Sequence, residues 1–432
     1  MPKGRRILLA TLGSLGDLHP YLALARELKA RGHSPVVATS ATYREKVEAD
    51  GITFAPLRPD EADFGDPEMV FRLANRPLRG TEYVIRQMVL PHLRGSYDDL
   101  MAATAETDLL ISHPLTYAVP LVAEKRGLPW AGTALQPIGF LSAFDPPVLP
   151  PVAWMARLRR LGPGFHRTVF ALAQGVSSLW ARPIHELRRE LGLRKAAANP
   201  IIAGQFSPFF NLALFSPAFA ASQPDWPPRT VVTGFPFYDG GAIGYERMEP
   251  KLQEFLRSGP APVVFTLGST IVREAGGFFR ESLKALGELE VRSVLVTGKD
   301  PRNQPSTVLP SRLLTVSYAP YGELFPEAAA IVHQGGVGTT AQALRSGRPQ
   351  LVVPHAHDQP DNAARVVRHG LGKSLAPGRY KAARVAAILH ELLEDKGCAL
   401  KASFMGAVVR AERGAVRAAE AIEQAMGSGF RG

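Results

Sequence analysis

The sequence predicts an α/β protein made of two similar halves, each with a parallel sheet covered by helices. Short apolar runs alternate with helical patterns along the chain, which is the arrangement of βαβ units. Both halves also share one local plan of strand, Gly-Ser turn and helix, at Leu12-Gly13-Ser14 and again at Leu267-Gly268-Ser269. The length of 432 residues suggests two or three domains of ordinary size, or two large ones.

The first half opens with a βαβ unit. An apolar run at residues 6–11 predicts a strand, residues 13–16 a tight turn, and residues 21–31 a helix that Gly32 ends. A second strand follows at residues 35–39. Later buried strands are expected at 108–112, 128–133 and 211–215. The N-terminal domain therefore extends over residues 1–221.

The second half begins after two breaks in the pattern. Residues 223–229 and 239–244 are rich in Pro and Gly, so we place an interdomain linker at 222–246. A C-terminal domain is expected at 247–405, and a final helix at 406–432 that packs back toward the N-terminal domain. Its strands are predicted at 262–266, 293–297, 313–316, 330–332 and 351–353.

Composition narrows the class of protein and its surroundings. No run of 18 apolar residues exists, and the N-terminus passes directly into a strand, so neither a membrane span nor a signal peptide is predicted. The single cysteine, Cys398, rules out an internal disulfide and favours the reducing cytoplasm.

The net charge of +11 is concentrated in one segment. Residues 152–195 hold nine Lys and Arg against Glu186 and Glu190, which gives +7. Aromatic and aliphatic residues interleave with these charges, a pattern that suits peripheral contact with the inner face of a membrane better than a nucleic-acid groove. The alternative is a solvated basic face.

A Gly-rich turn lies between a predicted strand and helix in the second half. The apolar run at 330–332 is followed by His333, then by Gly335, Gly336 and Gly338, and Thr339 opens a helical pattern. Such a turn presents N–H groups and the positive end of the helix dipole, which makes it a ready anion site.

Two interpretations of this turn need no family resemblance. Gly336-Val-Gly338-Thr-Thr-Ala341, with Asp358 twenty residues after Gly338, fits the dinucleotide fingerprint of a nicotinamide-dependent oxidoreductase. That fingerprint usually follows the first strand of its domain, whereas this turn comes far along the chain. The other interpretation is a turn without a ligand.

A longer pattern carries a resemblance. The pattern spans about 45 residues at fixed spacing and consists of Tyr318-Ala-Pro-Tyr-Gly-Glu-Leu-Phe-Pro, His333-Gln-Gly-Gly-Val-Gly-Thr, Gly347-Arg-Pro, Pro354, Asp358-Gln359 and Asn362-Ala. Together they resemble the donor-binding signature of family 1 nucleotide-sugar glycosyltransferases. The resemblance implies the GT-B fold, with two Rossmann-like domains facing a central cleft, and a nucleotide-sugar co-substrate in place of a cofactor.

The resemblance also implies donor-binding roles. Tyr318, next to Ala319, stands where the family has a Trp that stacks on the base; the alternative is a core residue at a strand end. Gln342 stands where a Glu usually pairs with the ribose, which leaves room for dTDP-sugars as well as UDP-sugars. The remaining expected contacts are the diphosphate-binding His333, Gly335, Gly336, Gly338, Thr339 and Ser269, the sugar-binding Asp358 and Gln359, and Gly16 on the first turn.

Attack by an acceptor hydroxyl needs a general base. Many family members use a His on the first turn, supported by an Asp after a later strand. Here Asp17 and His113 hold those two positions in exchanged order. Members resembling sterol glucosyltransferases, macrocycle-modifying transferases and rhamnolipid rhamnosyltransferases also carry Asp on the first turn. Asp17 is therefore the expected base, with His19 as its rival. A helix N-cap is the alternative role of Asp17.

The acceptor pocket is expected in the least regular segments of the N-terminal domain, 64–95 and 137–180. Phe140, Phe144, Phe165 and Phe170 suggest a phenolic, sterol-like or lipid-like acceptor. No Asp-x-Asp triplet is present, and His355 with His357 is too small a set for a metal site, so no metal is expected.

The sequence thus predicts an inverting, metal-independent hexosyltransferase that uses a UDP- or dTDP-sugar. A non-enzymatic nucleotide-sugar-binding protein and a nucleotide-sugar epimerase of the same fold are the alternatives. Nothing in the sequence fixes the oligomeric state.

Overall fold

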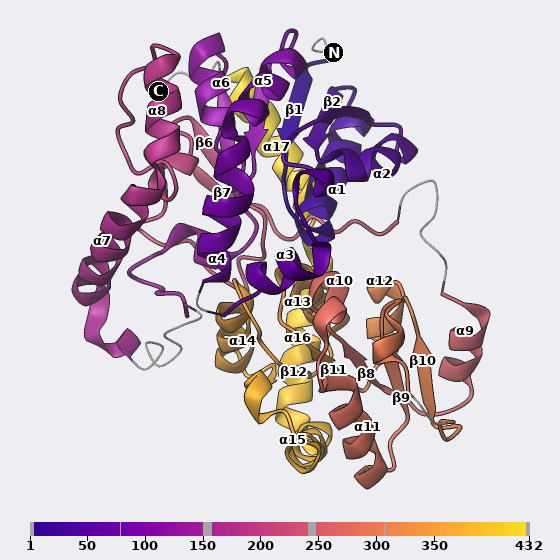
Figure 1. Cartoon of the computed structure of the whole chain (residues 1–432). Helices are drawn as coiled ribbons and strands as arrows, with labels where there is room; N and C mark the ends of the chain where they lie inside the picture. The colour runs from indigo at the N-terminus through magenta and orange to yellow at the C-terminus, as the bar shows by residue number, and fades with distance from the viewer. Residues whose placement is uncertain (1–3, 78, 150–157, 241–247, 306–307, 429–432) are drawn as a thin grey trace. The chain divides into compact units, whose positions relative to one another are not determined.

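The structure is a computed structural model that describes residues 4–77, 79–149, 158–240, 248–305 and 308–428 (Figure 1). The chain forms two compact units. Unit 1 contains Met1–Pro147, Trp154–Ile243 and Glu412–Gly432, and unit 2 contains Val148–Ala153 and Gly244–Ala411.

Unit 1 is built on a parallel sheet of seven strands in the order β3-β2-β1-β4-β5-β6-β7. The central strand β1 is apolar and almost fully buried, and Leu8 pairs with Val36 on one side and Leu110 on the other. Apolar runs of this kind are typical of strands with both faces covered. The strands are β1 (Arg6–Ala10), β2 (Ser34–Thr39), β3 (Thr53–Pro56), β4 (Leu109–Ser112), β5 (Trp130–Ala134), β6 (Phe210–Ala213) and β7 (Thr230–Val232).

Helix α1 (Leu15–Ala30) begins earlier than the sequence predicts. Ser14 caps it, and Asp17 completes a capping box, so the helix starts six residues before the expected residue 21. Pro20 lies inside the helix, near its start. The other helices longer than a few residues are α2 (Arg44–Ala49), α3 (Pro67–Ala74), α5 (Leu93–Ala103), α6 (Val119–Arg126), α7 (Gly162–Trp180), α8 (Arg182–Glu190) and α17 (Gly414–Gly427).

The C-terminal helix α17 packs against α1 within unit 1. Arg31 contacts Glu423 at 2.9 Å and Glu420 at 3.3 Å, which ties the end of α1 to α17. The expected start of this helix at residue 406 is wrong. Residues 406–411 belong to the preceding helix, which ends at Ala411, and α17 begins at Gly414.

The segment expected to be a linker contains a strand. β7 lies within residues 222–246 and pairs in parallel with β6, so unit 1 extends beyond the predicted boundary at 221. Its three residues are too few to stand out as an apolar run between the Pro- and Gly-rich stretches around them.

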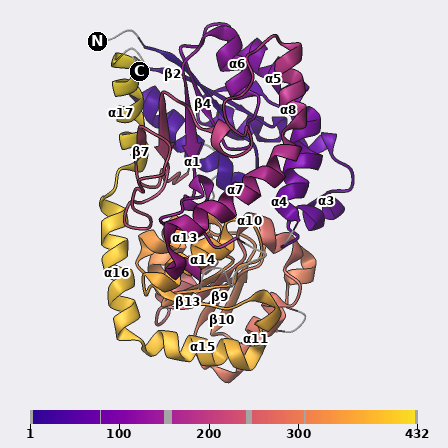
Figure 2. The same ribbon diagram turned by 90° about the vertical axis from the view of Figure 1, so that its left-hand side faces the viewer.

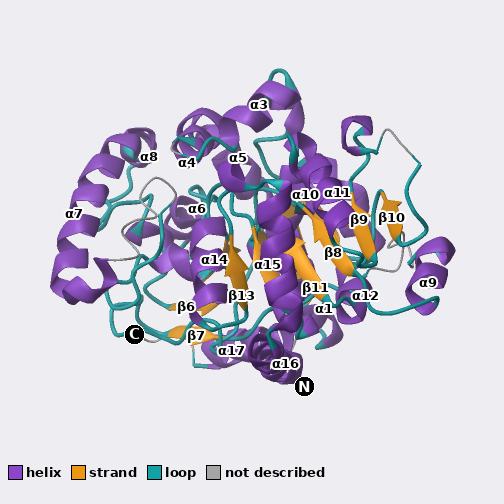
Figure 3. Ribbon diagram, turned by 90° about the horizontal axis from the view of Figure 1, so that it is seen from below, coloured by secondary structure: helices purple, strands orange, loops and turns teal. Residues whose placement is uncertain are grey.

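Unit 2 has a parallel sheet of six strands in the order β10-β9-β8-β11-β12-β13, which lie side by side in Figure 3. Phe265 and Ile331 on neighbouring strands are fully buried. The strands are β8 (Val263–Thr266), β9 (Ser293–Val296), β10 (Leu313–Val316), β11 (Ala330–His333), β12 (Gln350–Val352) and β13 (Gly372–Ser374).

The helices of unit 2 surround its sheet, and α16 packs against α13 (Figure 2). They are α9 (Pro250–Arg257), α10 (Gly268–Ile271), α11 (Phe278–Glu288), α12 (Tyr321–Leu324), α13 (Val337–Ser346), α14 (Gln359–Arg368), α15 (Ala382–Glu394) and α16 (Lys396–Ala411). The predicted α/β class is confirmed in both units.

Candidate active site

In unit 1, Asp17 and His113 meet at the carboxyl ends of β1 and β4. Asp17 is the third residue of α1, and its Oδ1 lies 3.3 Å from His113 Nε2. Its Oδ2 accepts hydrogen bonds from the N–H of Ser14 (2.7 Å) and from Ser14 Oγ (3.0 Å). His113 is buried, whereas 29% of the Asp17 side chain is exposed. The carboxylate is therefore held in place and still accessible.

The backbone after His113 determines which ring nitrogen carries the proton. The N–H of Leu115 donates to His113 Nδ1 at 3.2 Å, so in the neutral ring Nδ1 is the acceptor and Nε2 holds the hydrogen. That hydrogen points to Asp17 Oδ1. The imidazole thus acts as a donor to the carboxylate, and the carboxylate is the group able to accept a proton.

The surroundings of Asp17 keep it ionised. Burial raises the pKa of its carboxyl. The hydrogen bonds from His113 and Ser14 and the nearby imidazole together lower the pKa by more than burial raises it, so the pKa lies below its usual 3.8. The N-cap alternative is wrong, because Ser14 is the N-cap of α1 and Asp17, at the third position of the helix, is the acidic member of the capping box.

His19 faces away from this pair. Two residues along a helix turn a side chain by about 200° from Asp17, and the His19 ring stacks on Tyr238 at 5.0 Å. Burial, with a smaller effect of the Lys46 charge, lowers the pKa of His19 to about 3. The structure brings Asp17 and His113 together and places the rival base elsewhere.

The first turn requires glycine at one position. Gly13 has φ of +131°, and a Cβ there would lie 2.3 Å from Asp17 Oδ2. A side chain at this position would therefore push the carboxylate out of its hydrogen bonds. Gly16, the expected donor contact, gives its N–H to Ser14 Oγ.

In unit 2, His333 is the last residue of β11 and is completely buried. Its Nε2 lies 3.0 Å from Gln350 Oε1, and its Nδ1 accepts from the N–H of Gly335 at 3.1 Å. Burial lowers the pKa of His333 to about 4, so the ring is neutral at physiological pH. Both nitrogens are engaged within the protein, so this geometry offers no ring nitrogen to a diphosphate. His333 shapes the turn.

The loop after β12 closes over the same turn. Asp358 Oδ2 accepts from the N–H of Val337, the first residue of α13, at 3.0 Å, and from Asn362 Nδ2 at 2.7 Å. Asn362 Nδ2 also donates to the carbonyl of Gly335 at 2.9 Å. Two members of the donor signature thus hold the Gly-rich turn against α14.

Gln359, the other residue expected at the sugar, is buried and binds its own loop. Its Oε1 accepts from the N–H groups of His355 (2.8 Å) and Ala356 (3.2 Å). A Cβ at Gly335, where φ is +87°, would lie 2.7 Å from Val352 and 3.2 Å from the Gln359 carbonyl. This close approach explains the glycine at 335.

The start of α13 presents its first N–H groups next to the other Gly turn of the unit. Gly336 is the N-cap, and the N–H groups of Gly338 and Thr339 lie in the first turn, where a helix supplies no partner. Thr339 Oγ1 accepts from Gln334 Nε2 at 3.2 Å. That same amide would meet a Cβ on Gly268 at 2.3 Å, so the Gly268-Ser269 turn adjoins the His333 turn.

The residues expected to contact the nucleobase and the ribose of the donor lie on separate elements of unit 2. Tyr318 follows β10 and is 36% exposed, so it is not a core residue, whereas Ala319 is buried. Gln342 lies on α13, and its buried Oε1 has no hydrogen-bond partner among the described residues.

No group of three His, Cys, Asp or Glu able to hold a metal ion occurs among the residues that the structure describes. Burial lowers the pKa of His355 to about 4, and His357 has a left-handed backbone with φ of +54°.

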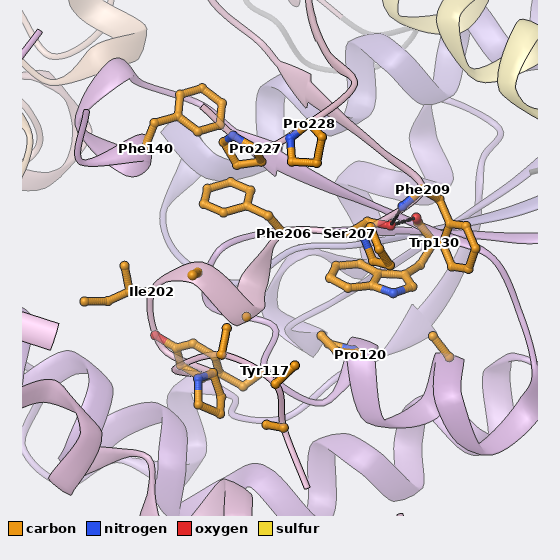
Figure 4. Close-up of a pocket in the computed structure, with 18 of the residues that line it drawn as sticks. Tyr117, Pro120, Trp130, Phe140, Ile202, Phe206, Ser207, Phe209, Pro227 and Pro228 are labelled. Carbon is orange, nitrogen blue, oxygen red and sulfur yellow. Dashed lines mark hydrogen bonds between the residues drawn. The ribbon is translucent and has the colours of Figure 1, made fainter. Parts of the chain in front are cut away.

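The four phenylalanines expected to bind the acceptor do not gather into one pocket. Phe140 and Phe170 line a cavity of unit 1 (Figure 4 shows Phe140), whereas Phe144 and Phe165 are 41% and 38% exposed and lie outside its lining. Phe140 is stacked on Trp226 at 4.4 Å.

Sequence reasoning gave no role to several residues that build these sites. Ser14, Gln334, Gln350 and Asn362 all hold site residues in place. Gln334 and Asn362 belong to the signature, and Ser14 lies on the first Gly-Ser turn, whereas Gln350 could be found only from the pairing of β11 with β12.

Known proteins are similar to this chain in fold and in amino-acid sequence. A glycotransferase of kitacinnamycin has a TM-score of 0.71 at 22% identity, over 98% of this chain and 100% of that one. VinC, a glycosyltransferase solved with DTDP, has a TM-score of 0.67 at 21% identity, over 98% and 99%. The two parallel sheets match these structures, which shows that the chain has the GT-B fold.

Sequence comparison narrows the class. Residues 280–417 match the erythromycin biosynthesis protein CIII-like C-terminal domain, and residues 7–136 match the glycosyltransferase family 28 N-terminal domain. The O-mycaminosyltylonolide 6-deoxyallosyltransferase of Streptomyces fradiae is 32% identical over 97% of each chain. The chain belongs to the family 1 glycosyltransferases of the GT-B fold, and it is an enzyme of that type.

A second group of relatives is longer. A sterol 3-beta-glucosyltransferase of Aspergillus fumigatus is 28% identical over 96% of this chain, which spans only 29% of that protein. No described helix is long and apolar enough to cross a membrane.

Proposed function

We propose that the protein transfers a hexose of the glucose or rhamnose type, with inversion, from a UDP- or dTDP-sugar to a hydroxyl of an apolar small molecule. The observation that carries the proposal is the contact between Asp17 and His113, a buried imidazole that directs its N–H at an accessible carboxylate. The names of the relatives support the substrates, since they include a macrolide deoxyallosyltransferase, a sterol glucosyltransferase and a protein solved with DTDP.

Asp17 would act as the general base. It takes the proton of the acceptor hydroxyl while that oxygen bonds to the anomeric carbon, and the bond from this carbon to the diphosphate breaks. A single displacement inverts the anomeric centre. His113 directs its Nε2–H at the carboxylate, so it orients Asp17 and offsets part of its charge.

The leaving diphosphate would be stabilised by the start of α13 and without a metal ion. The N–H groups of Gly338 and Thr339 and the positive end of the helix dipole supply the stabilisation. Asp358 and Asn362 hold the turn in the shape that presents these groups. His333 holds it as well, because its Nδ1 accepts a hydrogen bond from the N–H of Gly335.

Recognition of the nucleoside would rest on Tyr318 and Gln342. The exposed Tyr318 ring provides a stacking surface for the base. The Gln342 amide carries one acceptor and one donor group, so it does not require both ribose hydroxyls. This supports the use of dTDP- as well as UDP-sugars.

We also propose peripheral contact with the inner face of a membrane through α7. Leu172, Val176 and Leu179 are 70%, 58% and 78% exposed and share one face of this helix, because they are four and three residues apart. Its opposite face is buried through His166 and Phe170. The excess of positive charge in residues 152–195 supports an anionic surface as the partner.

The test of the proposed function is nucleotide release from UDP-glucose and dTDP-rhamnose, with and without a phenolic or sterol acceptor. Release that depends on the acceptor, together with a glycosylated product, supports a transferase. Binding without release would favour the nucleotide-sugar-binding alternative. Release without an acceptor, accompanied by an epimerised sugar, would favour the epimerase.

A further inference from the structure

A cavity of about 1260 Å³ lies within unit 1, apart from the dyad of Asp17 and His113. Its walls come from α6, α7 and α8, from the strand β5 and from the segment before β6. In Figure 4 the rings of Tyr117, Trp130, Phe140 and Phe206 surround the open space.

The cavity extends along α6, and the residues of the dyad are not part of its lining. Pro129, Phe209 and Pro228 line the cavity, and they precede β5, β6 and β7 at the amino ends of these strands. Tyr117 and Phe140, which follow the carboxyl ends of β4 and β5, line it as well, so the cavity extends toward the edge of the sheet where Asp17 and His113 lie. No residue of 13–19 or 112–116 is among the described residues that line the cavity.

The lining selects for a neutral, apolar occupant. The charged side chains among its described residues already have partners. Arg188 contacts Glu124 at 2.6 Å, Asp225 accepts from Ser142 Oγ at 2.6 Å, and Arg167 lies over the Phe144 ring at 5.2 Å. Aromatic and aliphatic surface makes up most of the remainder, so a ligand would be held by apolar contact.

The size of the cavity calls for a large occupant. The cavity is partly open to solvent, so a ligand can enter it without rearrangement of the interior. Pockets for drug-sized ligands measure roughly 300–1,000 Å³, and this cavity exceeds that range. Water would leave the aromatic walls solvated at a cost in stability.

We propose that this cavity is a second ligand site, which binds one neutral, largely apolar molecule of polycyclic or macrocyclic size. It is separate from the place where the acceptor hydroxyl meets Asp17. A ligand there would rest on one side against α7 and on the other against Trp130 and Phe206, and would join α7 to the body of unit 1.

The experiment uses the whole protein and the neutral fluorophore N-phenyl-1-naphthylamine as the probe. Energy transfer from the indole rings of Trp130 and Trp226, which line the cavity, reports binding at this place. Ala171→Phe on α7 and Ala203→Phe before β6 each put a ring into the cavity from a different element. Val176→Phe, on the exposed face of α7, is the matched control.

The proposal expects one probe per chain, with affinity weakened about 10-fold or more by each filling variant, which is the scale of overpacking by one ring. Val176→Phe and Asp17→Asn should bind the probe as the wild type does. The filling variants should still glycosylate a small phenolic acceptor that the wild type uses. Circular dichroism identifies a variant that has lost its fold, and the other filling variant then decides.

Two results would overturn the proposal. Probe binding that is unchanged in both folded filling variants would show that the cavity is not the site. Loss of transfer together with loss of probe binding would show that the cavity is the pocket of the acceptor itself. If no nucleotide sugar supports transfer by the wild type, the proposed function fails, whereas the binding comparison still tests the cavity.

Discussion

The two units prepare their sites in different ways. In unit 1, backbone and side-chain donors from Ser14 and His113 surround one carboxylate and leave part of it accessible. In unit 2, the side chains of His333, Asp358 and Gln359 hydrogen-bond to the protein's own backbone or to a buried amide. Unit 1 thus offers a reactive side chain, whereas unit 2 offers the N–H groups of a turn that its side chains hold in shape. The two kinds of site should respond differently to substitution.

The largest effect is expected at Asp17. Asp17→Asn keeps the shape and one accepting oxygen but cannot take a proton, so turnover should fall roughly 100- to 10,000-fold. Donor affinity, measured by calorimetry, should stay the same because unit 2 is untouched. His113→Ala should cost less than Asp17→Asn, since it removes only the orienting donor. An equal loss in donor affinity would contradict the separation of roles.

The next effect separates a shaping role from direct contact at His333. His333→Ala should reduce activity about 10- to 1000-fold, the scale of losing preorganised stabilisation of the leaving group. His333→Asn places an acceptor where Nδ1 lies and can keep the hydrogen bond from Gly335, so it should retain much more activity. The exposed His390 supplies the control His390→Ala. Equal losses for the Ala and Asn variants would favour direct contact with the diphosphate.

His333 and Asp17 should contribute to the pH dependence of stability in different pH ranges. The folded pKa of His333 is about 4, below the usual 6.5, so its contribution is complete above pH 6.5 and is lost as pH falls toward 4. The pKa of Asp17 lies below 3.8, so its contribution is lost only in stronger acid. Thermal melts across pH should show His333→Asn flattening the first decline and Asp17→Asn altering only the second. A decline between pH 6.5 and 4 that is identical in His333→Asn would exclude His333 as a source.

The smallest effect is expected at the ribose. Gln342→Glu supplies a carboxylate that accepts from both ribose hydroxyls, so it should shift preference from dTDP toward UDP by a few-fold, about 1 kcal/mol. Competition binding of the two nucleotides measures the shift. Unchanged relative affinities would show that Gln342 does not contact the ribose.

The sequence predicted the sheets better than the roles of the side chains. Long apolar runs such as 6–11 and 262–266 identify buried strands, because few other structures bury such runs. The short strands β3, β7 and β13 were missed, because three or four residues with mixed polarity carry little pattern. The early start of α1 was missed because Pro20 masked a helix that Ser14 caps.

For the candidate site, the sequence indicated which residues gather and not what each one touches. The pairing of Asp17 with His113 was expected, because both follow strands whose carboxyl ends meet at one edge of the sheet. The hydrogen-bond partner of His333 Nε2 is Gln350, which lies on the neighbouring strand β12 and is not part of the donor-binding signature. Its buried position depends on packing that spacing along the chain does not encode.

The assignment of Asp17 as the general base is tested most directly by single-turnover transfer to an aliphatic alcohol at several pH values, with donor in excess. The wild type, Asp17→Asn and His19→Ala should be compared side by side, because an alcohol does not ionise without help in this range. We expect slow transfer by Asp17→Asn at every pH and transfer by His19→Ala at a rate close to that of the wild type. A fast Asp17→Asn together with an inactive His19→Ala would contradict this assignment and would make His19 the base.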